Sequence, residues 1–371
     1  MAGAMVVAAA GLLAAGSNQR TAAAAVQPQT NSCDLTAPGR IVAIGDVHGA
    51  FDRYTTILRE AKLVDARNHW IGGNATLVHT GDAIDRGDES RKVLDLIRQL
   101  EGEARKAGGR LVFLLGNHEV MRMAGDWRYV TKTDVESYRT AQSEAVRERF
   151  YAEVLKASEA AARAKGEKLD VKAFRKEFLE KASPDAIEME VAYSPAGQYG
   201  GWLREHDIMA RINGIVFVHA GPARTFADRG CAAMNAEARE ELKAPVNLSD
   251  PKLTDRMLWN ADGPLWYRGL VGVEPAASPD DVTAILKGLG ATRLVVGHTA
   301  STPGRIRSLQ DGRVIAIDSG MLGGRMFPDG EPSALEIQDG KFTAIYVGKR
   351  DVLITTGQGG APDAPLLPTR R

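Results

Sequence analysis

The chain has 371 residues, 44% of them hydrophobic, which suffices for one large folded domain or two small ones. Its 47 basic residues balance its 47 acidic residues, so the formal net charge is zero. This balance excludes a global attraction for nucleic acid or for an anionic membrane surface, and any attraction for an anionic substrate must be local to one site.

The first 25 residues are apolar and alanine-rich and contain no acidic residue. This composition resembles a secretory signal, although the segment before its apolar stretch lacks lysine and arginine. We therefore expect residues 1–32 to be a signal peptide or a disordered leader, and the protein to be periplasmic or secreted, or cytoplasmic if the leader is not a signal. The apolar run is too short and too rich in alanine and glycine to serve as a permanent membrane span.

Six short apolar runs, rich in β-branched residues or leucine, predict strands buried on both faces. They are residues 40–44, 76–79, 111–115, 215–218, 293–296 and 314–317. Apolar residues at helical spacing predict helices between them, with Asp88 capping the second and the sequence Ser278-Pro279 starting a later one. Further strands at 334–337, 343–347 and 352–355 predict a meander. We expect an α/β fold in which two mixed β-sheets pack face to face and are flanked by helices.

Residues 131–190 are charged and alanine-rich and carry two apolar stripes at helical spacing. The first stripe is Val146, Phe150, Val154 and Leu155; the second is Val171, Phe174, Phe178 and Leu179. Lys165-Gly166 marks a break between them, which predicts a helical hairpin inserted in a domain of residues 33–356. The hairpin is either a cap beside the site or a solvated excursion. The glycine- and proline-rich residues 357–371 predict a disordered tail.

Five short loops with histidine, aspartate or asparagine follow the predicted strands. Their sequences are GDVHG from residue 45, GDAIDRG from 81, GNHE from 116, HAG from 219 and GHT from 297. Active sites of open α/β sheets lie beyond the carboxyl ends of strands, so we expect these loops to meet. Their side chains are the ligands that a two-metal hydrolytic centre uses.

In order and spelling these motifs resemble the metallophosphoesterase superfamily and, within it, the phosphoprotein phosphatase branch. GDxxDRG and GNHE are the most specific part, and the resemblance extends from Ile41 to about Ser319. GWLR at 201–204 and DGPLWYR at 262–268 make the chain similar to bacterial-type, Shewanella-like phosphatases. The resemblance implies an α/β/β/α sandwich.

It also implies two divalent metal ions, with manganese expected and iron or zinc as alternatives. Asp46 and His48 would bind the first ion, and Asp82 would lie between the two. The second ion would be held by Asn117, His219 and His298. A carboxylate with two free oxygens can bridge ions about 3.5–4 Å apart, and such a pair can activate one shared hydroxide that attacks phosphorus.

The implied general acid is His118, which we do not expect to bind metal. In the resembling family the histidine of GNHE protonates the leaving group and is oriented by the second aspartate of GDxxDRG, here Asp85. A carboxylate beside an imidazole fixes the tautomer that the acid requires. Asp85 could instead be a residue that caps its own loop.

Guanidinium groups suit phosphate oxygens, which makes Arg86 and Arg268 the candidate phosphate ligands, although Arg86 could equally be a structural ion-pair partner. Leu115 stands before GNHE where eukaryotic enzymes have an arginine, so one clamp is missing or comes from elsewhere. Three other arginines could supply it: Arg122, Arg128 and Arg224. Asp318, after another strand, could hydrogen-bond a metal-bound histidine. The remaining histidines match no motif and are interpreted as structural or surface residues: His69, His79 and His206.

The two cysteines, Cys33 and Cys231, have two open interpretations. In an exported protein they would form a disulfide between the mature N-terminus and the segment after His219. Otherwise they are unrelated buried thiols.

The most direct function is a metal-dependent phosphomonoesterase, acting on phosphotyrosine or on phosphoserine and phosphothreonine in proteins. The aromatic residues Trp259, Trp266 and Tyr267 slightly favour an aryl substrate, unless they are simply core. A diadenosine-tetraphosphate or other small-phosphoester hydrolase is the alternative, because that branch shares both specific motifs. Nucleases usually carry GHxH, where this chain has Ala300. A non-catalytic metal-binding scaffold is remote because all six ligands are present.

Overall fold

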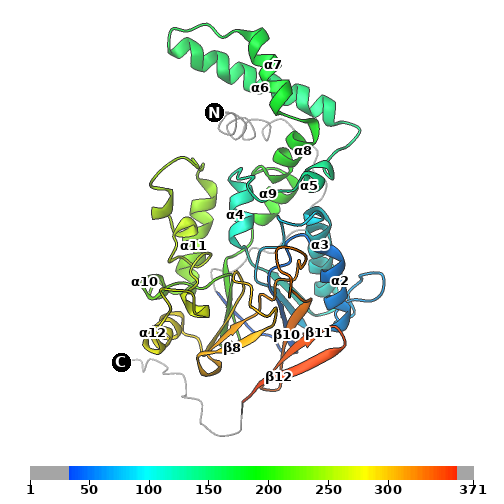
Figure 1. Ribbon diagram of the computed structural model, residues 1–371, viewed down its shortest axis with the longest axis vertical. Coiled ribbons are helices and arrows are strands. Elements are labelled where there is room, and N and C mark those ends of the chain that lie inside the picture. Colours follow the sequence, from blue (N-terminus) through cyan, green and yellow to red (C-terminus); the bar gives the residue numbers. More distant parts are fainter. Residues whose placement is uncertain (1–32, 357–371) are drawn as a thin grey trace.

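The protein consists of two six-stranded sheets that pack face to face, as the computed structural model of residues 33–356 shows. The expected leader, 1–32, and the expected tail, 357–371, lie outside the described residues. Figure 1 shows α2 and α3 on one flank of the sheets and α10, α11 and α12 on the other. The predicted sandwich with flanking helices is confirmed.

Each sheet contains both parallel and antiparallel pairs of strands. One sheet has the order β12 (Lys349–Thr355), β11 (Lys341–Tyr346), β10 (Ser333–Gln338), β2 (Ile41–Ile44), β3 (Thr76–His79) and β4 (Arg110–Phe113). The other has the order β1 (Asp34–Leu35), β5 (Met209–Ile212), β6 (Ile215–Val218), β7 (Arg293–Val296), β9 (Val314–Ala316) and β8 (Arg307–Leu309). β2, β3 and β4 run parallel to one another, as do β6, β7 and β9.

The central strands are short and buried on both faces. β2, β3 and β6 are buried at every position, as their continuous apolar sequences predict. One face of each sheet contributes to a shared core between the sheets, with Phe217 and Leu335 among its members. The opposite faces pack against the helices in a second, larger core.

Local sequence predicted the start of one helix correctly, at Ser278, and the cap of another wrongly, at Asp88. The remaining bounds are α2 (Phe51–Glu60), α3 (Ser90–Lys106), α4 (Asn117–Met123), α9 (Gln198–Leu203), α10 (Arg224–Ala227), α11 (Cys231–Lys243) and α12 (Pro279–Leu289), with short 3-10 turns η1 (Leu253–Asp255), η2 (Met257–Trp259), η3 (Gly269–Val271) and η4 (Gln310–Gly312). Ser278 caps α12 in a reciprocal capping box with Asp281. The predicted cap at Asp88 is wrong, because α3 begins only at Ser90, whose hydroxyl accepts the backbone N–H of Asp85 instead.

The segment 131–190 forms four helices: α5 (Lys132–Glu136), α6 (Ser143–Ala164), α7 (Val171–Lys181) and α8 (Pro184–Tyr193). Phe150, Val154, Phe174 and Phe178 join α6 and α7 in a small core of their own. Val171 and Leu179 are exposed instead of completing the second stripe. Figure 1 shows the α6–α7 hairpin projecting beyond α8, away from the sheets, so only the ends of this segment approach the strand-end loops.

A disulfide joins Cys33 to Cys231, with 5.9 Å between their Cα atoms. It connects the residue before β1 to the first residue of α11, and β1 pairs with β5 in the same region. The structure therefore contains the disulfide and not two unrelated buried thiols. Among residues 33–356, none of the helices combines the length and apolar character needed to cross a membrane.

Candidate metal centre and catalytic dyad

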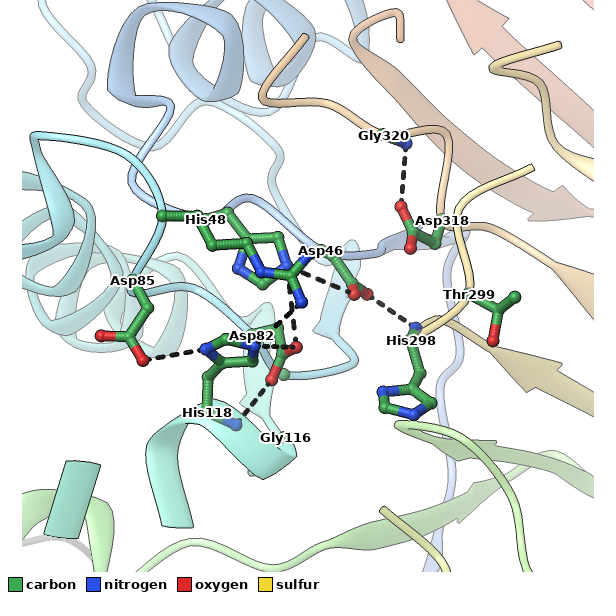
Figure 2. Close-up of polar contacts among 12 residues, drawn as sticks. Asp46, His48, Asp82, Asp85, Gly116, His118, His298, Thr299, Asp318 and Gly320 are labelled. Carbon is green, nitrogen blue, oxygen red and sulfur yellow. Dashed lines mark hydrogen bonds and ion pairs between the residues drawn. The ribbon is translucent and has the colours of Figure 1, made fainter. Parts of the chain in front are cut away.

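The five loops meet at one place because their strands run parallel in two neighbouring groups. β2, β3 and β4 end beside one another in one sheet, and β6 and β7 do so in the other. Figure 2 shows His48, Asp82 and His118 side by side, with Asp85 on one flank and Asp46, His298 and Asp318 on the other. The structure thus brings together residues as far apart in sequence as Asp46 and His298, whose carboxylate and backbone N–H are 2.9 Å apart.

Several of these residues have left-handed backbone conformations that L-residues rarely adopt. The φ angles are +49° at His48, +54° at Asp82, +66° at Asp85, +66° at Arg86 and +66° at His298. Such conformations cost on the order of 1–3 kcal/mol each and persist only where surrounding contacts impose them. Their concentration in these loops indicates that the surrounding contacts hold the side chains in place at the cost of a strained backbone.

The buried carboxylate of Glu119 imposes part of this geometry. It accepts the backbone N–H groups of Asp82, Ala83 and Gly116, each at 2.8 Å, and so ties the GDxxDRG loop to the GNHE loop. Burial and the nearby Asp82 raise the pKa of Glu119 to about 7. Sequence reasoning assigned no role to this residue, although it is the fourth letter of the GNHE motif.

Two glycines leave the space that the ligand carboxylates occupy. A Cβ atom at Gly116 would collide with the carboxylate of Asp82, and one at Gly297 would collide with that of Asp46. Gly116 and Gly297 open the motifs that follow β4 and β7. The glycines of GNHE and GHT are therefore required by close approach to the site.

Asp82, Asn117, His219 and His298 form one cluster of ligand atoms. The Nε2 atom of His219 lies 2.9 Å from Oδ1 of Asn117, 3.0 Å from Nδ1 of His298 and 3.3 Å from Oδ2 of Asp82. The Nδ1 atom of His219 faces the carbonyl of Thr80 at 2.9 Å, which leaves Nε2 free for the cluster.

Asp46, His48 and the same Asp82 form a second cluster. The Nε2 atom of His48 lies 3.8 Å from Asp46 and 3.7 Å from Asp82, measured to one carboxylate oxygen of each. The Nδ1 atom of His48 faces the carbonyl of Ile84 at 3.0 Å, so Nε2 again points toward the carboxylates. Asp82 belongs to both clusters, which is the position that a bridging ligand needs.

These residues fit a pair of divalent cations. Imidazole, carboxylate and amide oxygen donors converge, every one of these residues is buried, and a buried charge needs a partner such as a metal ion. The groups that could each hold an ion are His48, Asp82 and His118, and Asp82, His219 and His298. His118 is in the first group because its Nε2 is 3.8 Å from Asp82, and its Nδ1 faces the carboxylate of Asp85. Asp46 lies at the same distance, 3.8 Å, from Nε2 of His48.

The buried charges shift one another's proton affinities in opposite directions. Burial would lower the pKa of His219, but Asp82 and Asp46 outweigh it and raise that pKa to about 9. Burial lowers the pKa of His48 to about 3. Burial and Asp318 raise the pKa of Asp46 well above its usual value, whereas His219 and His118 overcome burial and hold that of Asp82 well below. Strongly divergent proton affinities in one cluster are typical of functional sites.

Asp318 adjoins this cluster, but its hydrogen-bond partner differs from the histidine that the sequence predicted. It hydrogen-bonds Asp46 and accepts the backbone N–H of Gly320 at 2.8 Å, whereas its interaction with His219 is electrostatic and, among residues 33–356, it hydrogen-bonds no histidine. Burial raises the pKa of Asp318 to about 6. Asp318 therefore positions Asp46, and the predicted hydrogen bond from Asp318 to a metal-bound histidine is wrong.

His118 and Asp85 form a buried pair at the other end of the site. The Nδ1 atom of His118 lies 2.8 Å from Oδ2 of Asp85, and both side chains are 1% exposed. The backbone N–H of His118 also donates to Asp82, which fixes its position relative to the metal ligands. Because Nδ1 of His118 faces the carboxylate of Asp85, Nε2 is the ring nitrogen that faces the site.

Arg86 and Arg268 are the two predicted arginines that reach this site. Nη2 of Arg86 is 3.3 Å from Nε2 of His118. Arg268 donates from Nη1 to the carbonyl of His298 at 3.0 Å and to the hydroxyl of Thr299 at 2.9 Å. Burial lowers the pKa of Arg268, although the carboxylates of Asp46, Asp318 and Asp82 oppose the shift. The two guanidinium groups thus stand at opposite ends of the cluster.

The three other candidate arginines are engaged elsewhere. Arg122 is 1% exposed and lies over the ring of Trp127, with Glu190 3.7 Å away. Arg128 is bound to the carboxylate of Asp126, and the side chain of Arg224 is largely exposed near Asp281. In this conformation none of the three arginines reaches the site to take the place of the arginine that eukaryotic enzymes have at the position of Leu115.

The histidines outside the motifs have structural partners, as interpreted from the sequence. His69 is exposed and contacts Glu103; His206 is buried between Glu101 and the carbonyl of Trp202. His79 is buried against Tyr54 and Phe113.

Sequence reasoning missed Tyr129, which lies on the segment that leads into the helical insertion. Its ring is 4.9 Å from that of His118 and 5.3 Å from the guanidinium of Arg86, and its carbonyl accepts the backbone N–H of Arg86 at 2.7 Å. The side chain is 40% exposed. Tyr129 therefore forms one wall of the site beside His118. Its sequence neighbourhood carries no motif that would have identified it.

Comparisons with known proteins agree with this geometry. Residues 39–301 match the family of calcineurin-like phosphoesterases. An uncharacterized protein of Schizosaccharomyces pombe is 31% identical over 328 residues, covering 84% of this chain and 82% of its own. Shewanella-like protein phosphatase 2 of Arabidopsis thaliana is 29% identical, covering 81% and 75%. The crystal structure of a cold-active protein-tyrosine phosphatase of a psychrophilic Shewanella species is 25% identical with a TM-score of 0.65, covering 87% and 82%.

Proposed function

The chain belongs to the calcineurin-like metallophosphoesterase family, and we propose that it is a dinuclear-metal phosphomonoesterase that acts on phosphoproteins. The observation that carries the proposal is the shared position of Asp82 between two clusters of buried ligands, with the His118–Asp85 pair beside it. This arrangement separates a place for activating the nucleophile from a place for protonating the leaving group.

Asp46, His48, Asp82, Asn117, His219 and His298 are the proposed metal ligands. Two divalent cations held there would supply an activated water and neutralise phosphate charge, and manganese is our first choice for both. Arg86 and Arg268 would bind phosphate oxygens from opposite ends of the cluster. His118, held by Asp85, would give its Nε2 proton to the departing oxygen.

Aromatic side chains near Arg268 favour phosphotyrosine over phosphoserine and phosphothreonine. Trp266 and Tyr267 are partly exposed beside it, and the ring of Trp266 is 5.9 Å from that of His298. Tyr129 adds a further exposed ring next to His118. Aromatic walls contact a phenyl ring over a larger apolar area than an alkyl chain offers.

A substrate panel tests the proposal. Purified protein should lose activity toward p-nitrophenyl phosphate on chelation and regain it with Mn²⁺. It should hydrolyse phosphopeptides faster than bis-p-nitrophenyl phosphate or diadenosine tetraphosphate. His219→Ala and Asp82→Asn should lower the bound metal measured by elemental analysis. Full metal occupancy in both variants would contradict the ligand assignment, and faster turnover of diadenosine tetraphosphate would replace the proposed substrate class.

Export is part of the same proposal, supported by the Cys33–Cys231 disulfide and the apolar leader. Intact mass of protein recovered from a bacterial periplasm should show a chain that begins between about residue 19 and Cys33 and lacks free thiols. A full-length chain with two titratable thiols in the cytoplasm would contradict export.

A further inference from the structure

A wide groove adjoins the proposed metal centre at Arg268. Its volume is about 1120 Å³, and Asp126, Arg128 and residues between Leu248 and Pro275 line it. Pockets of roughly 300–1,000 Å³ hold most drug-sized ligands. A phosphorylated side chain would occupy only the end of this groove, so the remainder is available to other parts of the substrate.

Much of the groove lining is apolar. Trp259, Trp266 and Tyr267 line it with partly buried rings, while Leu248 is 43% exposed and Val273 is 42% exposed. Exposed large hydrophobic residues usually mark surfaces that contact a ligand or another chain when they gather at one place. The groove therefore suits an extended peptide, whose backbone and apolar side chains can lie along it.

The charged residues of the lining are predominantly acidic once ion pairs are considered. Arg128 is neutralised by Asp126, with Nη2–Oδ2 and Nε–Oδ2 distances of 2.7 and 2.9 Å. Three further carboxylates are exposed and take part in no ion pair among residues 33–356: Asp255, Asp262 and Glu274. Arg268 is the remaining cation, and its guanidinium lies at the catalytic end, bonded to Thr299.

We propose that this groove binds the residues that flank the phosphorylated side chain of a protein substrate, and that Asp255, Asp262 and Glu274 select flanking lysine or arginine. The inference rests on the proposed function and adds the substrate's sequence class to it. The same carboxylates would repel the anionic phosphates of a dinucleotide polyphosphate, which sets the two substrate classes apart by charge.

The test compares phosphopeptides that share one phosphotyrosine and differ only in two flanking positions on each side, which are arginine in one peptide and glutamate in the other. An exposed ion pair changes an equilibrium by roughly 1.5- to 5-fold, so three should give the wild type about a tenfold higher kcat/KM for the basic peptide. The preference should shrink as the ionic strength rises from about 0.05 to 0.5 M, because salt screens exposed charges.

Two variants and one control assign the preference to the groove. The near-isosteric triple variant Asp255→Asn, Asp262→Asn, Glu274→Gln should bring the ratio of the two kcat/KM values close to one. Charge reversal, with lysine at all three positions, should invert it. Glu167→Lys reverses an exposed acid in the turn between α6 and α7 that forms no ion pair within residues 33–356, and it should leave the ratio as in the wild type.

The outcomes separate this inference from the proposed function. A wild-type ratio near one or below, or a ratio that survives the triple neutralisation, overturns the groove proposal while phosphatase activity stands. Absence of hydrolysis of both peptides and of p-nitrophenyl phosphate with Mn²⁺ present overturns the proposed function itself. A salt-sensitive ratio that collapses in the triple variant and persists in Glu167→Lys supports the proposal.

Discussion

Replacing Asp85 by asparagine should slow the hydrolysis of substrates with poor leaving groups more than that of substrates with good ones. The carboxylate of Asp85 faces Nδ1 of His118, with 2.8 Å between Oδ2 and Nδ1, and both side chains are buried. Asparagine has nearly the same shape but no charge. It therefore weakens the contact that orients His118 and stabilises the cationic, proton-donating ring, while leaving His118 in place.

The magnitude follows from the kind of hydrogen bond that is lost. A hydrogen bond to a charged group contributes about 1.5–3 kcal/mol and a neutral one about 0.5–1.5 kcal/mol. The difference of about 1–2 kcal/mol corresponds to roughly a 5- to 30-fold decrease in kcat. Removing the acid altogether, as in His118→Asn, should cost on the order of 10²–10⁴.

Phenyl phosphate and p-nitrophenyl phosphate provide the assay, because phenolate needs protonation and p-nitrophenolate needs little. Both variants should lose more activity on phenyl phosphate, in the order wild type, Asp85→Asn, His118→Asn, with metal content unchanged. Equal losses on the two substrates would show that His118 does not protonate the leaving group. A drop in bound metal in His118→Asn would instead make His118 a ligand, as its distance of 3.8 Å from Asp82 would permit.

Arg268→Ala should lower kcat/KM by a factor on the order of 10² for every phosphomonoester, because the guanidinium is placed to stabilise charge that grows on the phosphate oxygens. Tyr267→Ala should instead lower kcat/KM selectively for phosphotyrosine peptides. Faster wild-type turnover of phosphothreonine peptides would refute the preference for an aryl substrate. Burial raises the pKa of Asp134 from 3.8 to about 6, so the folded state binds more protons than the unfolded state between these values and stability falls as pH rises through this window. Asp134→Asn should therefore gain up to about 3 kcal/mol over the wild type at pH 7 and little at pH 4 in urea titrations; a gain independent of pH would contradict this. Replacing both cysteines by serine should lower the free energy of unfolding by about 2–5 kcal/mol, since the disulfide closes a span of 198 residues, and unchanged urea midpoints would exclude a stabilising role.

Local sequence predicted the elements whose energetics are local. β3, β6 and β7 coincide with the predicted runs, because continuous apolar sequence specifies strands buried on both faces wherever they pair. The capping box of α12 is likewise determined within four residues. The family resemblance rested on motifs in which chemistry constrains consecutive residues, and that membership is now shown.

Other features were decided by contacts between distant parts of the chain. Whether Arg122 reached phosphate depended on Trp127 and Glu190, and Glu190 comes from the far end of the inserted helices. The partner of Asp318 could not be predicted, because Asp46 follows a strand in the opposite sheet.

The sequence by itself determined which chemical groups the loops would carry, since strand, turn and ligand types are encoded within a few residues of one another. Only the tertiary structure decided what surrounds those groups: the ring of Tyr129 against His118, and the acidic groove that begins at Arg268. The physical reason is that apolar contact and charge act through space between side chains. The residues that meet at this site come from loops up to 252 positions apart, and their proximity depends on the pairing of both complete sheets.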